Sequence, residues 1–375
     1  MNVHDATAEE LADWDNHVVE APGGHVYQSR AWAACRRASG WTPRFFVTDD
    51  AARVLALTRP WPMIGGGSAY LPRGPVPMPG ALRGGWEVLA DRQVAVSDRL
   101  SAEGMDVVAA DPEVPAAEPM VRARIEAAGF RSIEEIQPSR HRMTLPLGGV
   151  ADEATVLAGM ARSTRQRIRG AQRDGVTVVR HDVRAGRAGP GEGFASPVEP
   201  AADALDRFYD LLLETGERRA FSFGPRSMFV TWWRTAYGAG HLVYLEARAG
   251  GPGGAPLAGL ILYRHGGRLS TVHSGDHAAT RTEHPGALHL LRWRAIQLAI
   301  REGCAEMDLG GVDVAGARGE PREGDPLYGL YQHKRAFGGQ WLELTGAHER
   351  VFDARGYALG RLTGRVVRLA RLVRR

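Results

Sequence analysis

The sequence predicts an α+β fold built from two related modules. The chain has 375 residues, which is more than a single hydrophobic core usually contains. Helix-like and strand-like periods also alternate in two successive rounds of similar order, which indicates an internal repeat. No run of about eighteen apolar residues suggests a membrane span. We expect the first module at residues 1–148 and the second at 149–342.

The first round begins with helical periods and continues into strands. Its expected elements are helices at 8–14 and 25–37, strands at 44–48, 54–59 and 68–72, a helix at 85–103, a strand at 105–110, a helix at 121–128 and a crossing strand at 142–147. The strand at 105–110 ends at Asp111 because a proline follows directly, and the residue before proline favours an extended or turn conformation.

The second round repeats the order with longer elements. They are a basic helix at 161–174, a strand at 177–180, helices at 204–217 and 226–237, strands at 241–248, 256–265 and 268–274, a long helix at 285–302 and a strand at 305–309. The stretch 184–202 is rich in glycine, proline and alanine, which predicts a flexible loop.

Charge and cysteine content restrict the class of protein only loosely. A net charge of +4 favours an anionic partner without identifying it. Cys35 and Cys304 lie far apart in apolar surroundings, so we expect free thiols in a reducing compartment rather than a disulfide. No spacing of histidine and cysteine suggests zinc. The polar first residues lack the basic and apolar regions of a signal peptide, so we expect a cytoplasmic protein.

Lys334 is the most informative residue of the chain. Among 47 lysine and arginine side chains it is the only lysine. Guanidinium is a planar fork, whereas ammonium is a compact charge that can approach one oxygen from any direction. We therefore interpret Lys334 as a site residue, placed at the end of a strand or helix beside a turn. The alternative is a lysine that survived an arginine bias by chance on the surface.

Several segments in their order along the chain resemble the Fem family of aminoacyl-tRNA-dependent peptidyltransferases. They are 27–32 (YQSRAW), 71–76 (LPRGPV), 111–113 (DPE), 136–138 (IQP), the basic helix at 165–171 with 174–176 (DGV), 307–312 (MDLGGV) and the Lys334 segment. The resemblance implies two tandem modules of the GNAT acyltransferase fold. No additional heptad-patterned helices occur in 203–237, so it implies a compact member without the coiled-coil arm. It also implies that a strand within 343–353 returns to complete the first module, together with the rest of 343–375.

An aminoacyl ester is already activated. Transfer needs an unprotonated amine, alignment with the ester carbonyl, and positive charge where the oxyanion develops. The resemblance gives Lys334 this last role, or contact with the terminal phosphate of the tRNA. The family carries a Phe-Lys pair where this chain has His333 and Lys334. His333 is then either a proton-transfer group or a stacking replacement for the phenyl ring. Aminoacyl-tRNA is the expected co-substrate, with no cofactor and no metal.

Two aspartates follow strands near the expected cleft. Asp111 either orients the attacking amine or caps the turn before Pro112. Asp308 precedes Gly310 and Gly311, and we interpret it as structural because two glycines permit a tight backbone path.

The expected acceptor is a muramyl peptide linked to a nucleotide or a lipid, or a related peptide. The resemblance places Arg36 and Arg37 near its diphosphate, although a solvated helix face is the alternative. In the second module it implies acceptor contacts at Ser222, His273, Leu330 and Tyr331. The arginine of the family pattern is Gly224 here, with Arg226 two residues later.

The basic helix of the second module is the expected tRNA contact. Arg162, Arg165, Arg167 and Arg169 fall within eight residues, and RNA binding is largely electrostatic. A solvated helix face is the alternative.

The segment 359–375 places leucine and valine on one helical face and arginine on the other. It is either a basic interfacial helix at the inner membrane surface or a terminal helix that packs its apolar stripe on the first module. We expect a monomer.

Three classes of function remain open. They are aminoacyl-tRNA-dependent amide formation in cell-wall or natural-product synthesis, acyl-CoA-dependent N-acylation, and non-catalytic binding of muramyl peptide or RNA. A pyrophosphate loop for acyl-CoA would read Arg/Gln-x-x-Gly-x-Gly/Ala. The nearest candidate, 167–172, ends in glutamine within an expected helix.

Overall fold

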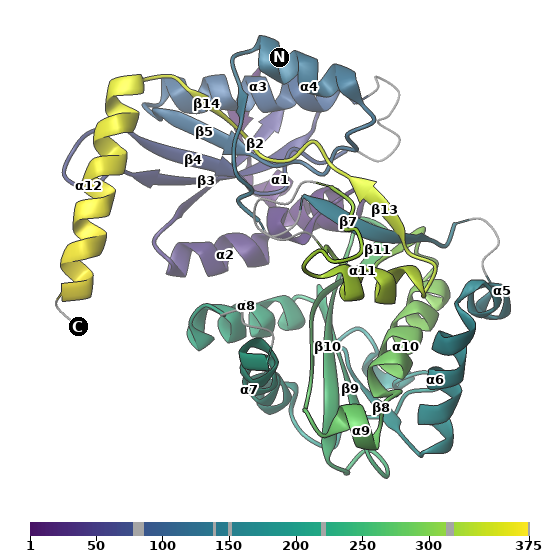
Figure 1. The fold of residues 1–375 in the computed structure, drawn as a ribbon. Coiled ribbons are helices and arrows are strands. Elements are labelled where there is room, and N and C mark those ends of the chain that lie inside the picture. The colour runs from purple at the N-terminus through teal and green to yellow at the C-terminus, as the bar shows by residue number, and fades with distance from the viewer. Residues whose placement is uncertain (78–85, 138–139, 149–151, 219–222, 313–318, 374–375) are drawn as a thin grey trace. The chain divides into compact units, whose positions relative to one another are not determined.

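The computed structural model describes residues 1–77, 86–137, 140–148, 152–218, 223–312 and 319–373. The chain forms two compact units, Met1–His141 with Glu343–Arg375, and Arg142–Leu342 (Figure 1). The second unit begins at Arg142 instead of residue 149 because strand β7 (His141–Pro146) belongs to the second sheet, where it pairs with β12 (Glu306–Asp308).

The first unit is built on a seven-stranded sheet in the order β1-β2-β3-β4-β5-β14-β6. Its strands are β1 (Val3–Asp5), β2 (Thr42–Thr48), β3 (Arg53–Pro60), β4 (Gly67–Leu71), β5 (Val107–Ala110), β6 (Arg131–Ser132) and β14 (His348–Val351). Among the described strands of this sheet, only β4 and β5 run parallel. Strand β14 pairs with β5 from His348 opposite Ala110, so the expected return of the C-terminal segment to the first module is confirmed.

The first unit also contains helical segments. They are α1 (Ala8–Ala12), a π-helix (Asn16–Glu20), a 3₁₀ turn (Val26–Gln28), α2 (Arg30–Ala38), α3 (Glu87–Ala102), α4 (Pro119–Ala127) and α12 (Ala354–Val373). Helix α3 buries Val96 and Leu100 against Phe46, Leu71 and Val108 of the sheet. The helix expected at 25–37 begins only at Arg30, because the Ser29 hydroxyl accepts a hydrogen bond from the backbone N–H of Trp32 and caps it.

The second sheet repeats the plan of the first. Its order is β13-β7-β12-β11-β10-β9-β8. The remaining strands are β8 (Thr177–His181), β9 (Leu242–Arg248), β10 (Pro256–His265), β11 (Arg268–Asp276) and β13 (Gln340–Glu343). Each sheet has four antiparallel strands, a fifth that joins the fourth in parallel, and a sixth that comes from a distant segment of chain. The predicted α+β fold of two related modules is confirmed.

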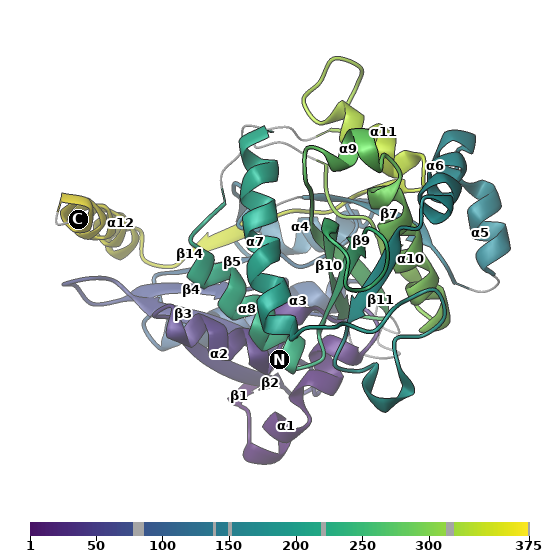
Figure 2. The same cartoon turned by 90° about the horizontal axis from the view of Figure 1, so that it is seen from below.

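Helices pack on both faces of the second sheet (Figure 2). They are α5 (Glu153–Gly159), α6 (Arg162–Arg173), a 3₁₀ turn (Gly186–Ala188), α7 (Ala201–Arg218), α8 (Arg226–Gly238), α9 (Thr280–Glu283), α10 (Ala287–Arg301) and α11 (Tyr328–Arg335). Successive side chains of a strand point to opposite faces. Tyr244 of β9 meets Phe208 of α7, whereas its neighbours Val243 and Leu245 join the core beneath α10. Between 201 and 238 the described chain forms only α7 and α8, without a coiled-coil arm.

Candidate functional site

The candidate site lies in the second unit, where the parallel strands β11 and β12 separate. They pair only from Arg268 opposite Glu306 to Ser270 opposite Asp308. Strand β12 then ends, while β11 continues to Asp276. Beyond the paired residues, the register of β11 against β10 shifts at Val272, which is the pattern of a β-bulge. After β12 the backbone no longer pairs with β11 but stays bonded to β7, where Leu309 N–H donates to the carbonyl oxygen of Met143 and Met143 N–H donates to that of Gly310.

Helix α11 places Lys334 against this turn. The Lys334 side chain is only 4% exposed, and its Nζ donates a hydrogen bond of 2.8 Å to the carbonyl oxygen of Gly311. Gly310 has φ +80°, and a β-carbon there would lie 3.2 Å from Lys334 Nζ and 2.8 Å from the carbonyl oxygen of Thr271. The alternative of a chance lysine on the surface is therefore wrong, because the ammonium is buried and its approach depends on a glycine.

Asp308 supports the same turn. Its Oδ1 accepts a hydrogen bond of 2.7 Å from the backbone N–H of Gly310. This contact agrees with the structural role predicted for Asp308, because it fixes the backbone that Lys334 approaches.

The sequence analysis missed two residues of α10 near this site, Arg292 and His289. Arg292 is 4% exposed, and its Nη2 lies 3.4 Å from the hydroxyl of Ser274 on β11. The His289 ring lies edge-on to His333, with 4.8 Å between ring centroids. Burial, with a smaller contribution from the cations Arg167 and Arg292, lowers the pKa of His289 to about 4. The signal that could have identified them is a histidine followed three positions later by an arginine within an apolar helix.

His333 is held as a neutral imidazole. Burial lowers its pKa to about 2, reinforced by Arg292, His289, Lys334 and Arg167. Its ring packs edge-on against Phe337, with 5.2 Å between centroids. A base this weak accepts a proton poorly from an ammonium group. The geometry matches the stacking alternative, and a part in proton transfer stays a prediction.

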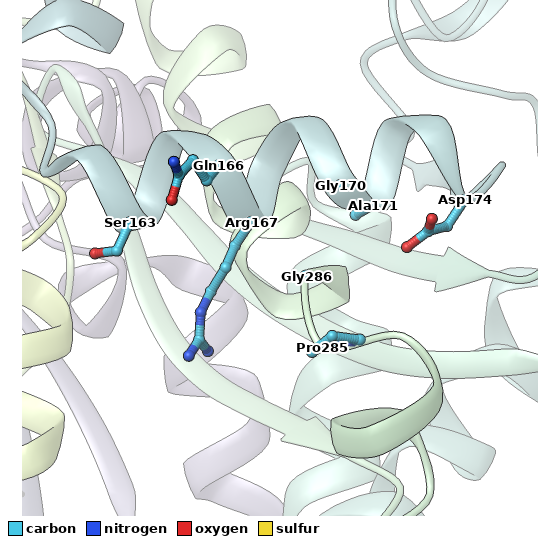
Figure 3. A pocket seen from close by; sticks show the side chains of 8 residues that line it. All are labelled: Ser163, Gln166, Arg167, Gly170, Ala171, Asp174, Pro285 and Gly286. Atoms are coloured by element: carbon cyan, nitrogen blue, oxygen red, sulfur yellow. The ribbon is translucent and has the colours of Figure 1, made fainter.

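A cavity of about 280 Å³ opens between α6 and the start of α10 (Figure 3). It is lined by Ser163, Gln166, Arg167, Gly170, Ala171, Asp174, Pro285 and Gly286. The two helices approach so closely here that a β-carbon on Gly286 would lie 2.2 Å from the carbonyl oxygen of Arg167. The charge of Arg167 also lowers the pKa of His289 and His333. The cavity lies at the start of α10, the helix that also carries His289 and Arg292.

The four arginines of α6 do not share one environment. Arg162, Arg167 and Arg169 are exposed. The guanidinium of Arg165 instead turns back to the C-terminal end of α5, where it donates to the carbonyl oxygens of Ala158, at 2.7 Å, and of Met160. The prediction that all four face a nucleic acid is corrected for Arg165, whose guanidinium binds the last carbonyl groups of a helix.

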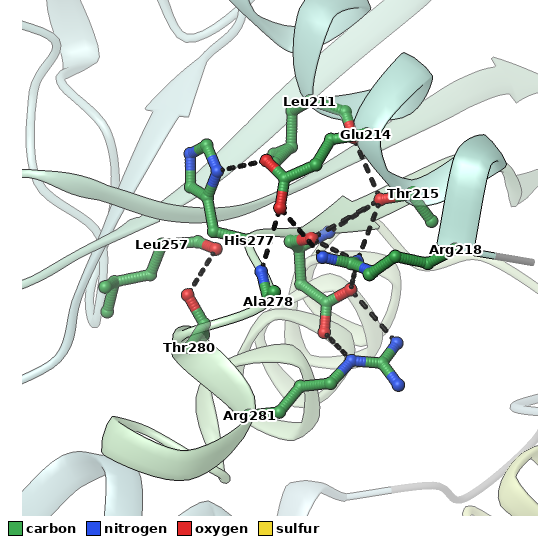
Figure 4. A network of polar contacts seen from close by, with 10 residues as sticks. Leu211, Glu214, Thr215, Arg218, Leu257, His277, Ala278, Thr280 and Arg281 are labelled. Carbon is green, nitrogen blue, oxygen red and sulfur yellow. Dashed lines mark hydrogen bonds and ion pairs between the residues drawn. The ribbon is translucent and has the colours of Figure 1, made fainter.

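A polar network around the buried Asp276 fixes the segment before α10 (Figure 4). The Asp276 carboxylate receives hydrogen bonds from Arg218 of α7, at 2.8 Å, and from Arg281 of α9, at 2.9 Å. Glu214 of α7 accepts from the backbone N–H of Ala278 at 2.9 Å and lies 2.7 Å from His277. These contacts hold the turn that brings Gly286 against α6.

This segment is also the better candidate for a pyrophosphate loop. Residues 281–286 read Arg-Thr-Glu-His-Pro-Gly and directly precede α10, whereas 167–172 lies within α6. His284 occupies the position of the first glycine in the Arg-x-x-Gly-x-Gly pattern, and Arg281 is paired with Asp276. Histidine in place of this glycine disfavours a close approach of pyrophosphate, because only a residue without a side chain lets pyrophosphate come close to the backbone.

In the first unit, Asp111 is enclosed. It is 1% exposed and accepts hydrogen bonds from the Tyr70 hydroxyl at 2.9 Å and from the backbone N–H of Arg73 at 2.7 Å. The Arg73 Nε lies 3.8 Å from its other oxygen. Burial raises the pKa of Asp111 to about 6 even though Arg73 opposes that rise. These contacts match the structural alternative, in which Asp111 fixes a turn, and its orientation of an amine stays a prediction.

Arg36 and Arg37 differ in their surroundings. The Arg36 guanidinium lies 5.3 Å from the Trp32 ring and 5.7 Å from the Trp41 ring. Trp32 in turn stacks on Tyr27, with 4.3 Å between centroids. Arg37 is exposed. The aromatic rings orient Arg36 as a cation–π partner, so it is the better placed of the two for an anion.

The acceptor residues predicted in the second unit are not all accessible. Ser222 lies outside the described residues. Arg226 pairs with Asp206, at 3.5 Å, and with Asp210. Tyr331 is 3% exposed and packs edge-on against Trp341, so it supports α11 from within the core.

His273 and Leu330 are partly buried. The His273 ring lies edge-on to Phe223, Phe229 and Trp233, and burial lowers its pKa to about 4. His273 is therefore a neutral member of an aromatic cluster, and contact of either residue with the acceptor stays a prediction.

Within the described ranges, no group of three or more His, Cys, Asp or Glu side chains could hold a metal ion. Cys35 and Cys304 are free thiols. None of the described helices combines the length and apolarity that a membrane crossing requires.

Residues 162–335 match the family model for an acetyltransferase (GNAT) domain. The curated protein sequences contain no match. The structure is similar to that of FemX, with a TM-score of 0.74 and 17% identity over 96% of this chain and 99% of that one. A conserved protein of unknown function from Bacteroides thetaiotaomicron VPI-5482 gives a TM-score of 0.53 at 13% identity, over 92% and 98% of the chains. L-PGS from Bacillus licheniformis gives 0.50 at 12% identity, over 97% and 98%. The chain therefore shares the fold of the FemX structure. Its described residues form two tandem GNAT-like modules and show no coiled-coil arm.

Proposed function

We propose that this protein transfers an amino acid from aminoacyl-tRNA to an amine of a muramyl peptide or a related peptide. The observation that carries the proposal is the buried ammonium of Lys334, held at the point where β11 and β12 separate. A buried, fixed cation stabilises a developing oxyanion more strongly than a cation in water does. The resemblance to the Fem family supports the identity of the donor and the acceptor.

The reaction requires little beyond alignment and charge. The acceptor nitrogen attacks the ester carbonyl, a C–N bond forms, and the C–O bond to the terminal ribose breaks. The proton of the amine then passes to the departing ribose oxygen. Lys334 stabilises the oxyanion or holds the terminal phosphate, while neutral His333 adds no second charge beside it. Alignment of an already activated ester accounts for much of the acceleration.

The donor reaches this site along α6. Arg162 and Arg169 are exposed and bind the phosphate backbone, and Arg167 lines the cavity at the start of α10. The serine, glutamine and aspartate side chains of that cavity suit the hydroxyl and base edges of an unpaired nucleotide.

The acceptor diphosphate binds at Arg36, which its aromatic neighbours hold in place, with Arg37 beside it in the sequence. Asp111, Ser222, Arg226, His273, Leu330 and Tyr331 remain the other proposed acceptor or catalytic residues. The protein acts as a cytoplasmic monomer that contacts the inner surface of the membrane when the acceptor is lipid-linked.

A second candidate is N-acylation from an acyl-CoA. The GNAT domain match over 162–335 favours it, and His284 in place of glycine disfavours it. The test incubates the protein with charged total tRNA and muramyl peptide precursors, with and without ribonuclease, and follows the mass of the acceptor. We expect a gain of one aminoacyl residue that ribonuclease abolishes. Activity that survives ribonuclease and requires an acyl-CoA would establish the second candidate. Binding of acceptor or RNA without any transfer would indicate a non-catalytic binder.

A further inference from the structure

The C-terminal helix α12 packs on the first unit through small residues instead of its leucines. A β-carbon on Gly360 would lie 2.2 Å from the Trp61 ring, and one on Gly356 would lie 2.8 Å from the Asp106 carboxylate. Tyr357 reaches Glu349 of β14 with its hydroxyl at 3.1 Å. The alternative is that this helix packs its apolar stripe on the first module. It is wrong for Leu359 and Leu362, the two stripe residues whose side chains are described.

Outside these contacts, α12 leaves large apolar side chains in solvent. Leu359 is 53% exposed and Leu362 is 57% exposed. Met63, two residues after Trp61, is 76% exposed. A single exposed leucine is ordinary in a folded protein, but two on one helical face that the packing contacts direct outwards need a partner.

The charge of the segment selects the kind of partner. From Ala354 onwards the sequence contains no Asp or Glu. It contains seven arginines, at 355, 361, 365, 368, 371, 374 and 375. Arg355, Arg361 and Arg365 are exposed next to the two leucines. A helix that carries exposed leucine beside arginine fits the boundary between anionic head groups and acyl chains.

We infer that α12 is an interfacial helix that docks this protein on an anionic lipid surface. Leu359 and Leu362 enter the acyl boundary, and the arginines contact the head groups. Nucleic acid would satisfy the arginines but would leave both leucines in water, so lipid is the partner that accounts for the whole face. The glycine contacts with Trp61 and Asp106 hold the helix on the first unit with this face outwards.

This inference deepens the proposed membrane contact but does not depend on the transfer reaction. Vesicle binding is measured without substrates, so transfer and docking can each fail alone.

The test is sedimentation of the full chain with vesicles of phosphatidylcholine and phosphatidylglycerol at 7:3, compared with phosphatidylcholine alone. We expect binding to the anionic vesicles only, weakened by salt. The double variant Leu359→Gln and Leu362→Gln keeps every arginine and should bind roughly tenfold or more weakly. Leu213→Gln, on α7, is the control, since Leu213 is also exposed, at 38%.

Equal sedimentation of the wild type and the double leucine variant would overturn the inference. So would a loss of tRNA binding in that variant with vesicle binding intact, which would assign the face to nucleic acid. A circular dichroism melt checks that the glutamine variant is folded. A third variant, Arg361→Gln with Arg365→Gln, should lose the preference for anionic lipid.

Discussion

The ammonium of Lys334 lies 3.2 Å from the point where a β-carbon on Gly310 would be. This closeness couples the only lysine of the chain to the left-handed turn after β12, where Gly310 has φ +80°. The same ammonium donates to the carbonyl oxygen of Gly311. The position of the cation is therefore set by the backbone, and both residues can be tested separately.

Replacement of Lys334 by arginine should nearly abolish transfer. The planar guanidinium cannot reproduce the single-point approach of an ammonium to one oxygen. Loss of such a donor typically costs about 2.7–4 kcal/mol, on the order of a hundred- to a thousandfold in rate. Arg335→Lys, the reverse change at the next, exposed position of α11, is the control. Turnover by Lys334→Arg at the wild-type rate would show that Lys334 has no role in the reaction.

Gly310→Ala should lower activity more than it lowers stability. The new methyl group would push on Lys334 Nζ and on the Thr271 carbonyl oxygen, and the left-handed backbone adds roughly 1–2 kcal/mol of strain. Gly303→Ala is a matched control, since Gly303 has φ +68° with no atom within 4 Å of its β-carbon position. Turnover and urea unfolding are measured for both variants. A similar loss of turnover in both would show that backbone strain alone is responsible.

His333→Phe should retain transfer and make the protein less sensitive to acid. In the folded state the pKa of His333 is lowered from 6.5 to about 2, so the unfolded chain takes up the proton first. The free energy of unfolding is therefore highest above pH 6.5 and decreases as the pH falls. Between pH 7 and pH 5 this loss is about 2 kcal/mol. Urea unfolding at the two pH values should show a smaller difference for the variant. A variant that folds normally but transfers a hundredfold more slowly would instead support proton transfer by His333.

Replacement of Arg162 and Arg169 by glutamine should weaken tRNA binding and reduce its dependence on salt. Each phosphate contact that is lost lowers the slope of log affinity against log salt concentration by about 1. Arg122→Gln with Arg124→Gln on α4 removes the same charge from the first unit and is the control. Filter binding of tRNA over a range of salt concentrations measures both. An unchanged slope in the α6 variant would show that these arginines lie on a solvated helix face and do not contact tRNA.

The sequence by itself determined the repeated order of strands and helices, because the periods of apolar residues follow directly from burial on a sheet or helix face. It also singled out Lys334, since a change of cation type is visible in the residue letters alone. The return of β14 to the first sheet came from the resemblance, and its pairing opposite Ala110 confirmed it.

Only the tertiary structure decided which side chains meet. His289 of α10 meets His333, the neighbour of Lys334 in the sequence, and Arg292 of the same helix reaches Ser274 of β11. No local period encodes either contact. Arg165 faces α5 rather than solvent because a neighbouring helix ends beside it. Leu359 and Leu362 face outwards because the glycine face of α12 fits against Trp61. A periodic pattern states that a helix has two faces, but the shape of the surface that receives the helix decides which face is buried.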